Sequence, residues 1–599
     1  MTPEDSLTGK IATLLTAYLQ EKGVPLPRVS FERPASSEHG DWSTNVAMAN
    51  TGALGQAPMV TAAQATQYLQ DKLGTDAPKI EIAKPGFINF FLPDSDYLGL
   101  VSGILTAGHD YGRNATLSKE RWVVEHTSPN PNKAMHLGHL RNNLVGMSIV
   151  RLLEWNGATV SCDAVDNNRG IAIAKLMWGF IAFMRKDEAT PATVEEWTAH
   201  PEVWETPADL GQVPDVFVAN CYSLGEKDFK ADVAVEAKVR DLVVQWETND
   251  ADVRQLWAFL LKYSYEGMGR TLTRLGNRWD KVWHESDHYQ AGKDYVTQGL
   301  AKGVFVKLED GAVLTNLEQF KLADTILLKR DGTALYITQD IALTDLKRKY
   351  YGADKLVWVI GPEQSLAMQQ LFAVCEQLGI GHRTDYRHIS YGYVGLKADD
   401  GGFKKMSSRE GTVVLIDDIL NDVKNRIVTE IMAEREWSDE EKEALPEKLA
   451  MAAVKFAFLK PDRSQEVTFD VEQSTQMRGD TGVYLLYTNV RLKSIMQKSG
   501  KAIETTPDMS RLAGGPAMEL VRLLSKFPEV VEHSKSDLSV HHVAQYLLSV
   551  CSTFNAWYAK EIILDGSDVE PARLALVKAC SIVIENGLSI MGIEPVGKM

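Results

Sequence analysis

The sequence predicts an α/β protein built around a doubly wound parallel sheet. Residues 159–165 and 355–361 are near-continuous apolar runs of the kind that form strands buried on both faces. From residue 121 onward, strand patterns alternate with helix patterns, which is typical of parallel sheets. The pattern changes on either side, so we expect an N-terminal α+β domain at 1–112, the sheet domain at 113–460 and a C-terminal helical bundle at 461–599.

Length and composition indicate an ordinary globular protein with several domains. The 599 residues are 44% hydrophobic and 24% charged. The net charge of −16 argues against a protein that coats nucleic acid non-specifically, although it leaves room for a local basic groove. The start of the chain has no signal-peptide pattern, and no apolar stretch approaches the roughly 20 residues of a membrane span. We therefore expect a cytoplasmic protein without a membrane segment.

The cysteines argue against a disulfide framework and against a structural zinc site. They are five in number, lie far apart and never form a C-x-x-C pair. Neither a disulfide nor a bound zinc ion is therefore expected.

The N-terminal domain begins with an amphipathic helix at residues 11–19 and carries β-like runs at 28–31 and 80–92. The stretch KPGFINFFLP places aromatic rings next to Asn89 near a turn. This composition can stack on an unpaired base, although a simple packing module would look similar.

Two further features of the sheet domain are expected. Residues 186–252 are rich in Pro, Glu and Trp and have poor periodicity, which indicates an insertion. The stretch ILLKRDGTALYIT predicts a β-hairpin, with Asp331 and Gly332 in a type I′ turn.

Helices dominate after residue 414. Amphipathic patterns cover residues 415–432 and 447–460, and Pro461 marks the junction to the last domain. Long helical patterns then follow at 484–496, 518–526, 543–558 and 572–588, which predicts a helical bundle.

The most informative stretch is VVEHTSPNPNKAMHLGHLRNN at residues 123–143, which indicates a strand, a tight loop and a helix. His136 and His139 lie one turn apart at the helix start, where free amides and the helix dipole favour phosphate oxygens. Gly138 between them lets a flat ring approach the backbone. Taken alone, the two histidines could equally be a metal pair or a surface pair.

A second motif, GGFKKMSSREG, occupies residues 401–411. Its glycines, hydroxyl groups, Lys404, Lys405 and Arg409 suit a basic loop that clamps a polyphosphate, although a solvated charged loop is the alternative. HLGH at a strand-to-helix turn followed by KMSSR on a later loop is far more specific than either motif alone.

This pair resembles the HIGH and KMSKS signatures of class I aminoacyl-tRNA synthetases. Over nearly the whole chain the pattern is similar to the arginyl-tRNA synthetase family. The stretches that carry the resemblance are HGDWSTNVAM, PGFINFFL, VVEHTSPNPNKAMHLGHLRN, TALYITQD, VWVIGPEQ, GVYLLYTNVRLKSI and GIEPVGKM. The resemblance implies a Rossmann-like catalytic domain that ligates L-arginine to tRNA(Arg) through an arginyl-adenylate, releasing AMP and pyrophosphate. It also implies ATP with Mg²⁺ and no zinc, and we expect a monomer.

The residues around the first motif suit a guanidinium, which is planar and best held by carboxylates. Glu125 ends the strand before HLGH, Asn130 lies in the loop, and Tyr336 and Asp340 share a face if a helix has started there. Each of them taken singly could instead be a structural cap or a surface group.

The resemblance extends these roles to further positions. Arginine would be held by Glu125, Asn130, Tyr336, Asp340 and Gln364. ATP would be bound by His136, Gly138, His139, Lys405, Met406 and Ser407. Catalysis would depend on His136, His139, Lys133 and Lys405. The tRNA would contact Phe87 and Asn89 through its D-loop, and Tyr484, Arg491 and Met599 near its anticodon.

Two departures from the family pattern stand out. Ser408 occupies the place of the second signature lysine. Many members of the family share this loss and carry a lysine just upstream of HxGH that substitutes for it, and Lys133 occupies that place here. Residues 165–175 read VDNNRGIAIAK where the family more often shows Gly-Asp-Trp-Gly, so no role is assigned there. The alternatives are a class I synthetase for another amino acid, an inactive tRNA-binding paralogue and a small-molecule adenylyltransferase.

Overall fold

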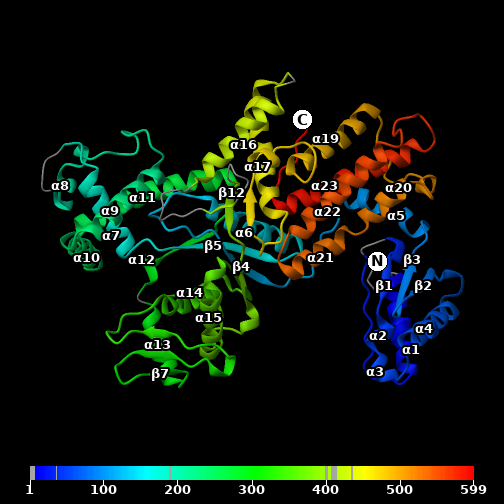
Figure 1. Ribbon diagram of the computed structural model, residues 1–599, viewed down its shortest axis with the longest axis horizontal. Helices are drawn as coiled ribbons and strands as arrows, with labels where there is room; N and C mark the ends of the chain where they lie inside the picture. The colour runs from blue at the N-terminus through cyan, green and yellow to red at the C-terminus, as the bar shows by residue number, and fades with distance from the viewer. Residues whose placement is uncertain are drawn as a thin grey trace. The chain divides into compact units, whose positions relative to one another are not determined.

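The computed structural model describes residues 7–34, 37–187, 192–289, 291–397, 403–405, 414–433 and 436–599 (Figure 1). The chain divides into two compact units. One comprises residues 1–106, 502–525 and 562–579, and the other comprises 107–501, 526–561 and 580–599.

The first unit contains a three-stranded antiparallel sheet in the order β1-β3-β2. Its strands are β1 (Trp42–Thr44), β2 (Lys79–Ala83) and β3 (Phe87–Phe91), and its longer helices are α1 (Leu7–Glu21), α4 (Pro58–Leu73) and α5 (Ser95–Ala107). The predicted helix at 11–19 is confirmed, and the run at 80–92 forms two strands. The run at 28–31 is not a strand, and the isolated bridge of this region, Glu32 to Ser43, directly follows it. Prolines at 25, 27 and 34 bracket this run and remove donors that a ladder needs.

A segment from the far end of the sequence is bonded into this first unit through Arg522 on α20 (Ala517–Leu524). Arg522 donates through Nη1 to Asp41 Oδ1 at 2.7 Å and through Nη2 to Asp94 Oδ1 at 2.8 Å. Tyr97 Oη donates to the same Asp41 oxygen at 2.7 Å. The Gly514 amide donates to Asp94 at 2.8 Å, and this bond together with Arg522 lowers the pKa of Asp94. Residues 502–525 are therefore an integral part of the N-terminal unit.

The second unit is organised around a five-stranded parallel sheet in the order β11-β10-β4-β5-β6. The strands are β4 (Arg121–Glu125), β5 (Thr159–Asp166), β6 (Lys281–His284), β10 (Lys355–Val359) and β11 (Tyr386–Ile389). The chain order starts at β4, runs outward to β6 and then returns to the other side of β4 at β10. The doubly wound sheet is thereby confirmed, with its topological switch point between β4 and β10.

Helices cover both faces of this sheet (Figure 1). The face with Val124, Cys162 and Val357 packs against α6 (Leu137–Trp155). The opposite face, with Val123 and Leu356, packs against α14 (Tyr336–Tyr351) and α15 (Ser365–Leu378). Burial on both faces explains why these strands read as continuous apolar runs.

The insertion between β5 and β6 is helical and has a core of its own. It contains α7 (Ile171–Phe183), α8 (Val194–Ala199), α9 (Pro214–Ala231), α10 (Val233–Glu247) and α11 (Ala251–Leu275). Phe180, Trp197 and Phe217 lie at the centre of this core. Helices α7 and α9 touch through glycines, because a Cβ on Gly179 would lie 1.9 Å from the Cys221 carbonyl oxygen.

The predicted hairpin at 326–338 is wrong in its turn and in most of its second strand. Strand β9 (Ile326–Leu328) pairs with β8 (Val313–Thr315), which in turn pairs with β7 (Phe305–Lys307), and only the Leu328–Ala334 bridge continues across the turn. Gly332 has a φ of +79°, whereas Asp331 is not among the positive-φ residues, so the turn is not type I′. Helix α14 begins at Tyr336 and its Thr338 hydroxyl donates to the Leu327 carbonyl, which ends the extended run.

The predicted helices after residue 414 are confirmed. They are α16 (Ile416–Glu430), α17 (Asp439–Leu459), α19 (Gly482–Ser499), α20, α22 (His541–Tyr558) and α23 (Glu570–Met591). The sequence patterns missed α21 (Phe527–Asp537), because Pro528 suggests a break although it stands in the first turn of this helix. Within the described residues, α23 alone is long and apolar enough to cross a membrane, but 83% of its apolar window is buried in the protein, as in a core helix.

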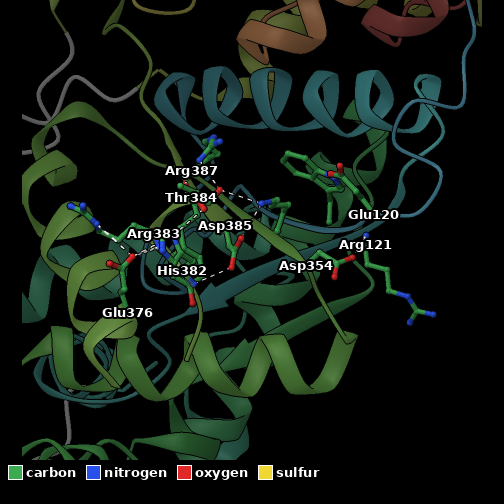
Figure 2. Close-up of polar contacts among 12 residues, drawn as sticks. Glu120, Arg121, Asp354, Glu376, His382, Arg383, Thr384, Asp385 and Arg387 are labelled. Atoms are coloured by element: carbon green, nitrogen blue, oxygen red, sulfur yellow. Dashed lines mark hydrogen bonds and ion pairs between the residues drawn. The ribbon is translucent and has the colours of Figure 1, made fainter. Parts of the chain in front are cut away.

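Charged side chains link neighbouring strands at the amino-terminal ends of the parallel strands, which we call the amino edge of the sheet (Figure 2). The opposite ends of the strands form the carboxyl edge. Asp354 accepts from the Arg121 amide at 2.9 Å. Asp385 accepts from Lys355 at 2.9 Å, from Arg348 at 3.3 Å and from the His382 amide at 3.0 Å. Burial alone would raise the pKa of Asp385, but these partners hold it below its usual value. The acidic groups of this edge are thus matched by donors from within the protein.

Candidate active site

The two histidines of the HLGH motif cap the start of α6 reciprocally. His136 is the N-cap residue, and its Nδ1 accepts from the Gly138 amide at 3.2 Å. His139 Nδ1 accepts from the His136 amide at 3.3 Å. The two rings stack with centroids 3.9 Å apart. A Cβ on Gly138 would lie 3.1 Å from the His136 ring. The space that this glycine leaves open is therefore filled by the imidazole of His136.

This capping fixes the chemistry of both rings. An Nδ1 that accepts a hydrogen bond leaves the proton of a neutral imidazole on Nε2. Burial, followed by the charge of Lys133, lowers the pKa of His136 to about 4. Burial, with His136 and Lys133 next, holds the pKa of His139 well below its usual value. At neutral pH the pair therefore offers two neutral Nε2–H donors.

The end of the KMSSR loop is bonded to the HLGH motif. Leu415 forms an antiparallel bridge with His136, the Leu137 amide donates to the Val414 carbonyl at 3.2 Å, and the Ile416 amide donates to the Met135 carbonyl at 3.1 Å. These bonds are made by residues 414–416, which follow the second motif at residues 401–411. Met406 and Ser407 lie outside the described residues. Lys405 ends strand β13 (Phe403–Lys405), which pairs with β12 (Val394–Lys397), and only its backbone is described.

A cavity of about 560 Å³ opens at the carboxyl end of β4. It is lined by all five residues predicted for arginine, namely Glu125, Asn130, Tyr336, Asp340 and Gln364. Asn130 accepts from the Asn167 amide group at 3.1 Å, and Asn167 also lines the cavity. His136, His139 and Lys133 are not part of this lining, so the described structure brings the arginine set together and leaves the histidines outside it, at the start of α6.

Negative charge dominates the cavity. Asp340 is open to the cavity but otherwise enclosed, and this enclosure, reinforced by repulsion from Glu125, raises its pKa to about 7. Burial likewise raises the pKa of Glu285, which lies on α12 (Glu285–His288). Because these carboxyls hold protons more tightly than free ones, the cavity is prepared for a cation.

One internal cation is already present at the bottom of the cavity. Lys347, only 1% exposed, donates to Glu125 Oε2 at 2.6 Å and to Asp163 Oδ1 at 3.1 Å. Burial would lower the pKa of Lys347, but the two carboxylates outweigh it and raise the pKa. Trp283 also donates to Asp163 at 2.8 Å. This network holds the Glu125 carboxylate in place from below.

Several residues of the site were not anticipated from the sequence. Lys347, Glu285, His288 and Asn167 line the cavity, and no local pattern marks them. Asn142 was also missed: it accepts from the Thr127 amide at 2.6 Å and donates to the Val359 carbonyl at 2.8 Å. It thereby ties the ends of β4 and β10 together at the switch point. In the sequence, the only indication of this role is the Asn142–Asn143 pair shortly after HLGH.

Two of the three residues expected near the anticodon, Tyr484 and Arg491, belong to one hydrogen-bond network between α19 and α22. Arg491 donates to Asn555 Oδ1 at 2.5 Å and to Tyr487 Oη at 2.9 Å, and Asn555 donates to Tyr484 Oη at 3.0 Å. Tyr484, Tyr487 and Arg491 are half-buried, so they form neither a closed core nor an open face. Met599 is 5% exposed.

The two residues expected at the tRNA D-loop differ in exposure. Phe87 is half-buried at the start of β3. Asn89 is 5% exposed and accepts from the Ser43 hydroxyl at 2.8 Å.

Comparison with known families agrees with the sheet and the site. The catalytic-domain family described as "tRNA synthetases class I (R)" matches residues 100–167 and 208–471. The DALR anticodon binding domain matches residues 485–599, and the arginyl tRNA synthetase N-terminal domain matches residues 7–92. The fold and the paired HLGH and KMSSR motifs therefore define a class I aminoacyl-tRNA synthetase.

Individual relatives narrow this class. An arginine–tRNA ligase from Treponema denticola is 32% identical over 521 residues, which are 84% of each chain. Another, from Bacteroides fragilis, is 30% identical and covers all of both chains. The chain belongs to the arginyl-tRNA synthetase family.

Solved structures agree on the fold. The arginyl-tRNA synthetase of Thermus thermophilus has a TM-score of 0.77 at 22% identity and covers 99% of this chain and 100% of its own. That of Plasmodium falciparum has a TM-score of 0.80 at 18% identity and covers 99% of both.

Proposed function

We propose that this protein ligates L-arginine to tRNA(Arg) in two steps. The arginine carboxylate attacks the α-phosphorus of ATP, forming arginyl-adenylate and releasing pyrophosphate. A ribose hydroxyl at the tRNA terminus then attacks the acyl carbon and AMP leaves. The observation that carries the proposal is the acidic cavity of about 560 Å³ at the carboxyl end of β4, beside a helix start of the phosphate-binding kind.

In the proposed complex, the arginine guanidinium pairs with Asp340 and Glu125 and packs against Tyr336. Charged donors bonded to carboxylates are stronger and more selective than neutral pairs, and a cavity with this charge rejects apolar amino acids. Asn130 and Gln364 are placed to bind the α-amino and carboxylate groups, and Asn167 orients Asn130.

On the nucleotide side, the α-phosphate lies at the start of α6. The Nε2–H groups of His136 and His139 donate to its oxygens, and Lys133 and Lys405 supply positive charge where negative charge develops. Gly138 lies between the two histidines in the first turn of α6, and we assign it to the same ATP site. Mg²⁺ enters with ATP, because this ion is usually held by substrate phosphates and water and needs no dedicated protein cage. Met406 and Ser407 belong to the loop that closes over the nucleotide.

For tRNA, the proposal assigns β3 to the D-loop, with Phe87 in contact and the buried Asn89 supporting the strand through its bond to Ser43. It assigns Tyr484, Arg491 and Met599 to the anticodon side. The domain limits that go with these roles are 1–112, 113–460 with the insertion at 186–252, and 461–599, of which residues 502–525 and 562–579 belong to the N-terminal compact unit. We propose that the enzyme is a cytoplasmic monomer without a membrane segment and without zinc in its active site.

Exchange of labelled pyrophosphate into ATP, measured with each amino acid in turn and with or without tRNA, tests the proposal. We expect exchange with arginine only. Exchange with another amino acid would assign a different specificity to the cavity, and the absence of exchange under all conditions would indicate a tRNA-binding protein without activity.

The tRNA assignment has a separate test. Arg491→Ala removes the cation from the α19 network, so tRNA binding should weaken and arginine-dependent exchange should fall at subsaturating tRNA. The expected coupling follows the tendency of this family to require tRNA for activation. An unchanged tRNA affinity would remove α19 from the tRNA contact surface.

A further inference from the structure

Two helices next to the catalytic sheet bring together three side chains that the proposed reaction does not use. His533 and Asp537 lie on α21 and His542 lies on α22. His542 Nε2 is 2.9 Å from Asp537 Oδ2, and His533 Nε2 is 3.7 Å from the same oxygen. One possible ligand atom from each residue lies within 4.8 Å of the other two. The two imidazoles therefore converge on a single carboxylate.

The backbone fixes this arrangement. His533 and Asp537 are separated by four residues and so lie on one face of α21. The chain then reverses at Leu538, whose φ of +49° is unusual for a residue with a side chain. Leu538 is 6% exposed in the core below the sheet. Arg463 adds a hydrogen bond of 2.7 Å to the Asp537 carbonyl. Burial of Leu538 thus holds the turn that brings His542 back toward α21.

We propose that His533, Asp537 and His542 bind one divalent transition-metal ion, of which zinc is the representative. Two imidazole nitrogens and one carboxylate oxygen suit such an ion, whereas Mg²⁺ and Ca²⁺ prefer oxygen ligands alone. Metal–ligand distances of about 2.0–2.2 Å require the three side chains to draw slightly inward. Their exposures of 61%, 45% and 22% leave them free to do so. Three protein ligands leave one position for water.

The surroundings favour these three residues over their neighbours. His541 stacks on His542 with ring centroids 3.8 Å apart, but it is bonded through Nδ1 to the Ser539 hydroxyl at 2.8 Å.

The five cysteines are all buried, and burial raises the pKa of each thiol, to about 11 for Cys162 and about 12 for Cys221. Folded protein therefore offers no ready thiolate that would compete for the ion. Since this set contains no cysteine, a search for Cys-based zinc patterns does not find it.

A bound ion would link α21 to α22 and so close a helical hairpin. Any ligand that binds the folded state alone stabilises it. Zinc should therefore raise the thermal unfolding midpoint of the protein.

The test uses the full untagged chain, freed of metal with a chelator and then dialysed, in the absence of nucleotide. Titration with ZnCl₂ followed by calorimetry should show one saturable equivalent, and MgCl₂ at the same concentrations should show none. His542→Ala and Asp537→Asn should each weaken zinc binding by at least about tenfold and reduce the zinc-dependent rise in unfolding midpoint. Circular dichroism verifies that the variants are folded.

His200→Ala is the matched control. His200 Nδ1 lies 3.4 Å from Glu202 in an exposed pair, and within the described part of the chain this pair has no third ligand grouped with it. The control should bind zinc as the wild type does. In a second readout, the visible spectrum of bound Co²⁺ should change in His542→Ala and not in His200→Ala. The proposal fails if wild-type protein shows no saturable zinc binding, or if binding survives unchanged in both His542→Ala and Asp537→Asn.

Discussion

Acidic residues have opposite environments at the amino edge and at the carboxyl edge of the parallel sheet. At the amino edge, Asp385 has three donors and a pKa below its usual value. At the carboxyl edge, Asp340 faces the cavity next to Glu125 and its pKa is raised to about 7. The same residue type is therefore stabilised as an anion at one edge and destabilised at the other.

This difference distinguishes carboxylates that stabilise the fold from carboxylates that are available to bind a ligand. An acid matched by internal donors adds to the free energy of unfolding, whereas an enclosed, unmatched acid lowers it until a cation binds. The crevice outside the carboxyl ends of parallel strands is where ligands bind in such sheets. Substitutions should accordingly affect catalysis at one edge and stability at the other.

The largest effect is expected from the histidines at the carboxyl edge. His136→Ala or His139→Ala removes a fixed N–H donor to the α-phosphate, so kcat for pyrophosphate exchange should fall about 10²-fold or more with a smaller change in KM. His382→Ala at the amino edge is the control and should leave kcat unchanged. An equal kcat in wild type and both active-site variants would remove the histidines from the reaction.

The next effect concerns arginine selection. Asp340→Asn keeps the shape of the side chain but removes its charge, so KM for arginine should rise about 10- to 100-fold while KM for ATP changes little. Asp345→Asn serves as the control, because Asp345 lies on the same helix but bonds to Lys349 and Tyr295 away from the cavity. If KM for ATP rose equally, Asp340 would have a phosphate-linked or structural role.

A pH profile sharpens the same point. With a pKa of about 7, Asp340 is increasingly protonated as the pH falls from 8 to 6. Because only the carboxylate pairs with the guanidinium, kcat/KM for arginine should decline below about pH 7 at saturating ATP and tRNA. Asp340→Asn should abolish this acidic limb. A limb that persists unchanged in the variant would belong to another group.

The smallest effect is expected at the amino edge. Asp385→Asn should lower the free energy of unfolding by about 1 kcal/mol at pH 7, since partly exposed ion pairs contribute little, and leave kcat unchanged. The pKa of Asp385 is lowered on folding, so its stabilisation is present above the unfolded value near 4 and is lost as the pH falls through the folded value. Denaturant titrations at pH 7 and below pH 4 should therefore show the difference between variant and wild type shrinking with acidity.

The sequence predicted the parts of this arrangement that depend on local patterns. The doubly wound sheet follows from apolar runs, and the helix start at His136 follows from a strand, a loop and a cap within about twenty residues. Glu125, Asp340 and Asn130 could be chosen because two acids and an amide suit a guanidinium, whereas Gln364 depended on family resemblance.

Other features depend on contacts between distant parts of the chain. Lys347 stands in the run Lys-Arg-Lys, where nothing local distinguishes the buried lysine, and its partners Glu125 and Asp163 are 222 and 184 residues away. Asn89 looked like an accessible turn residue, yet its alternating position in β3 turns it toward Ser43. The reciprocal histidine caps also escaped prediction, since they depend on side-chain rotamers at the helix start.

The bond between Asp41 and Arg522 has a consequence for the order in which the protein is made. The two residues are 481 positions apart. At about 5–20 residues per second of synthesis, Asp41 leaves the ribosome roughly 25 to 100 s before Arg522. During that interval Asp41 and Asp94 are present without the guanidinium that pairs with them. The N-terminal unit, although translated first, can be completed only when the chain is nearly finished.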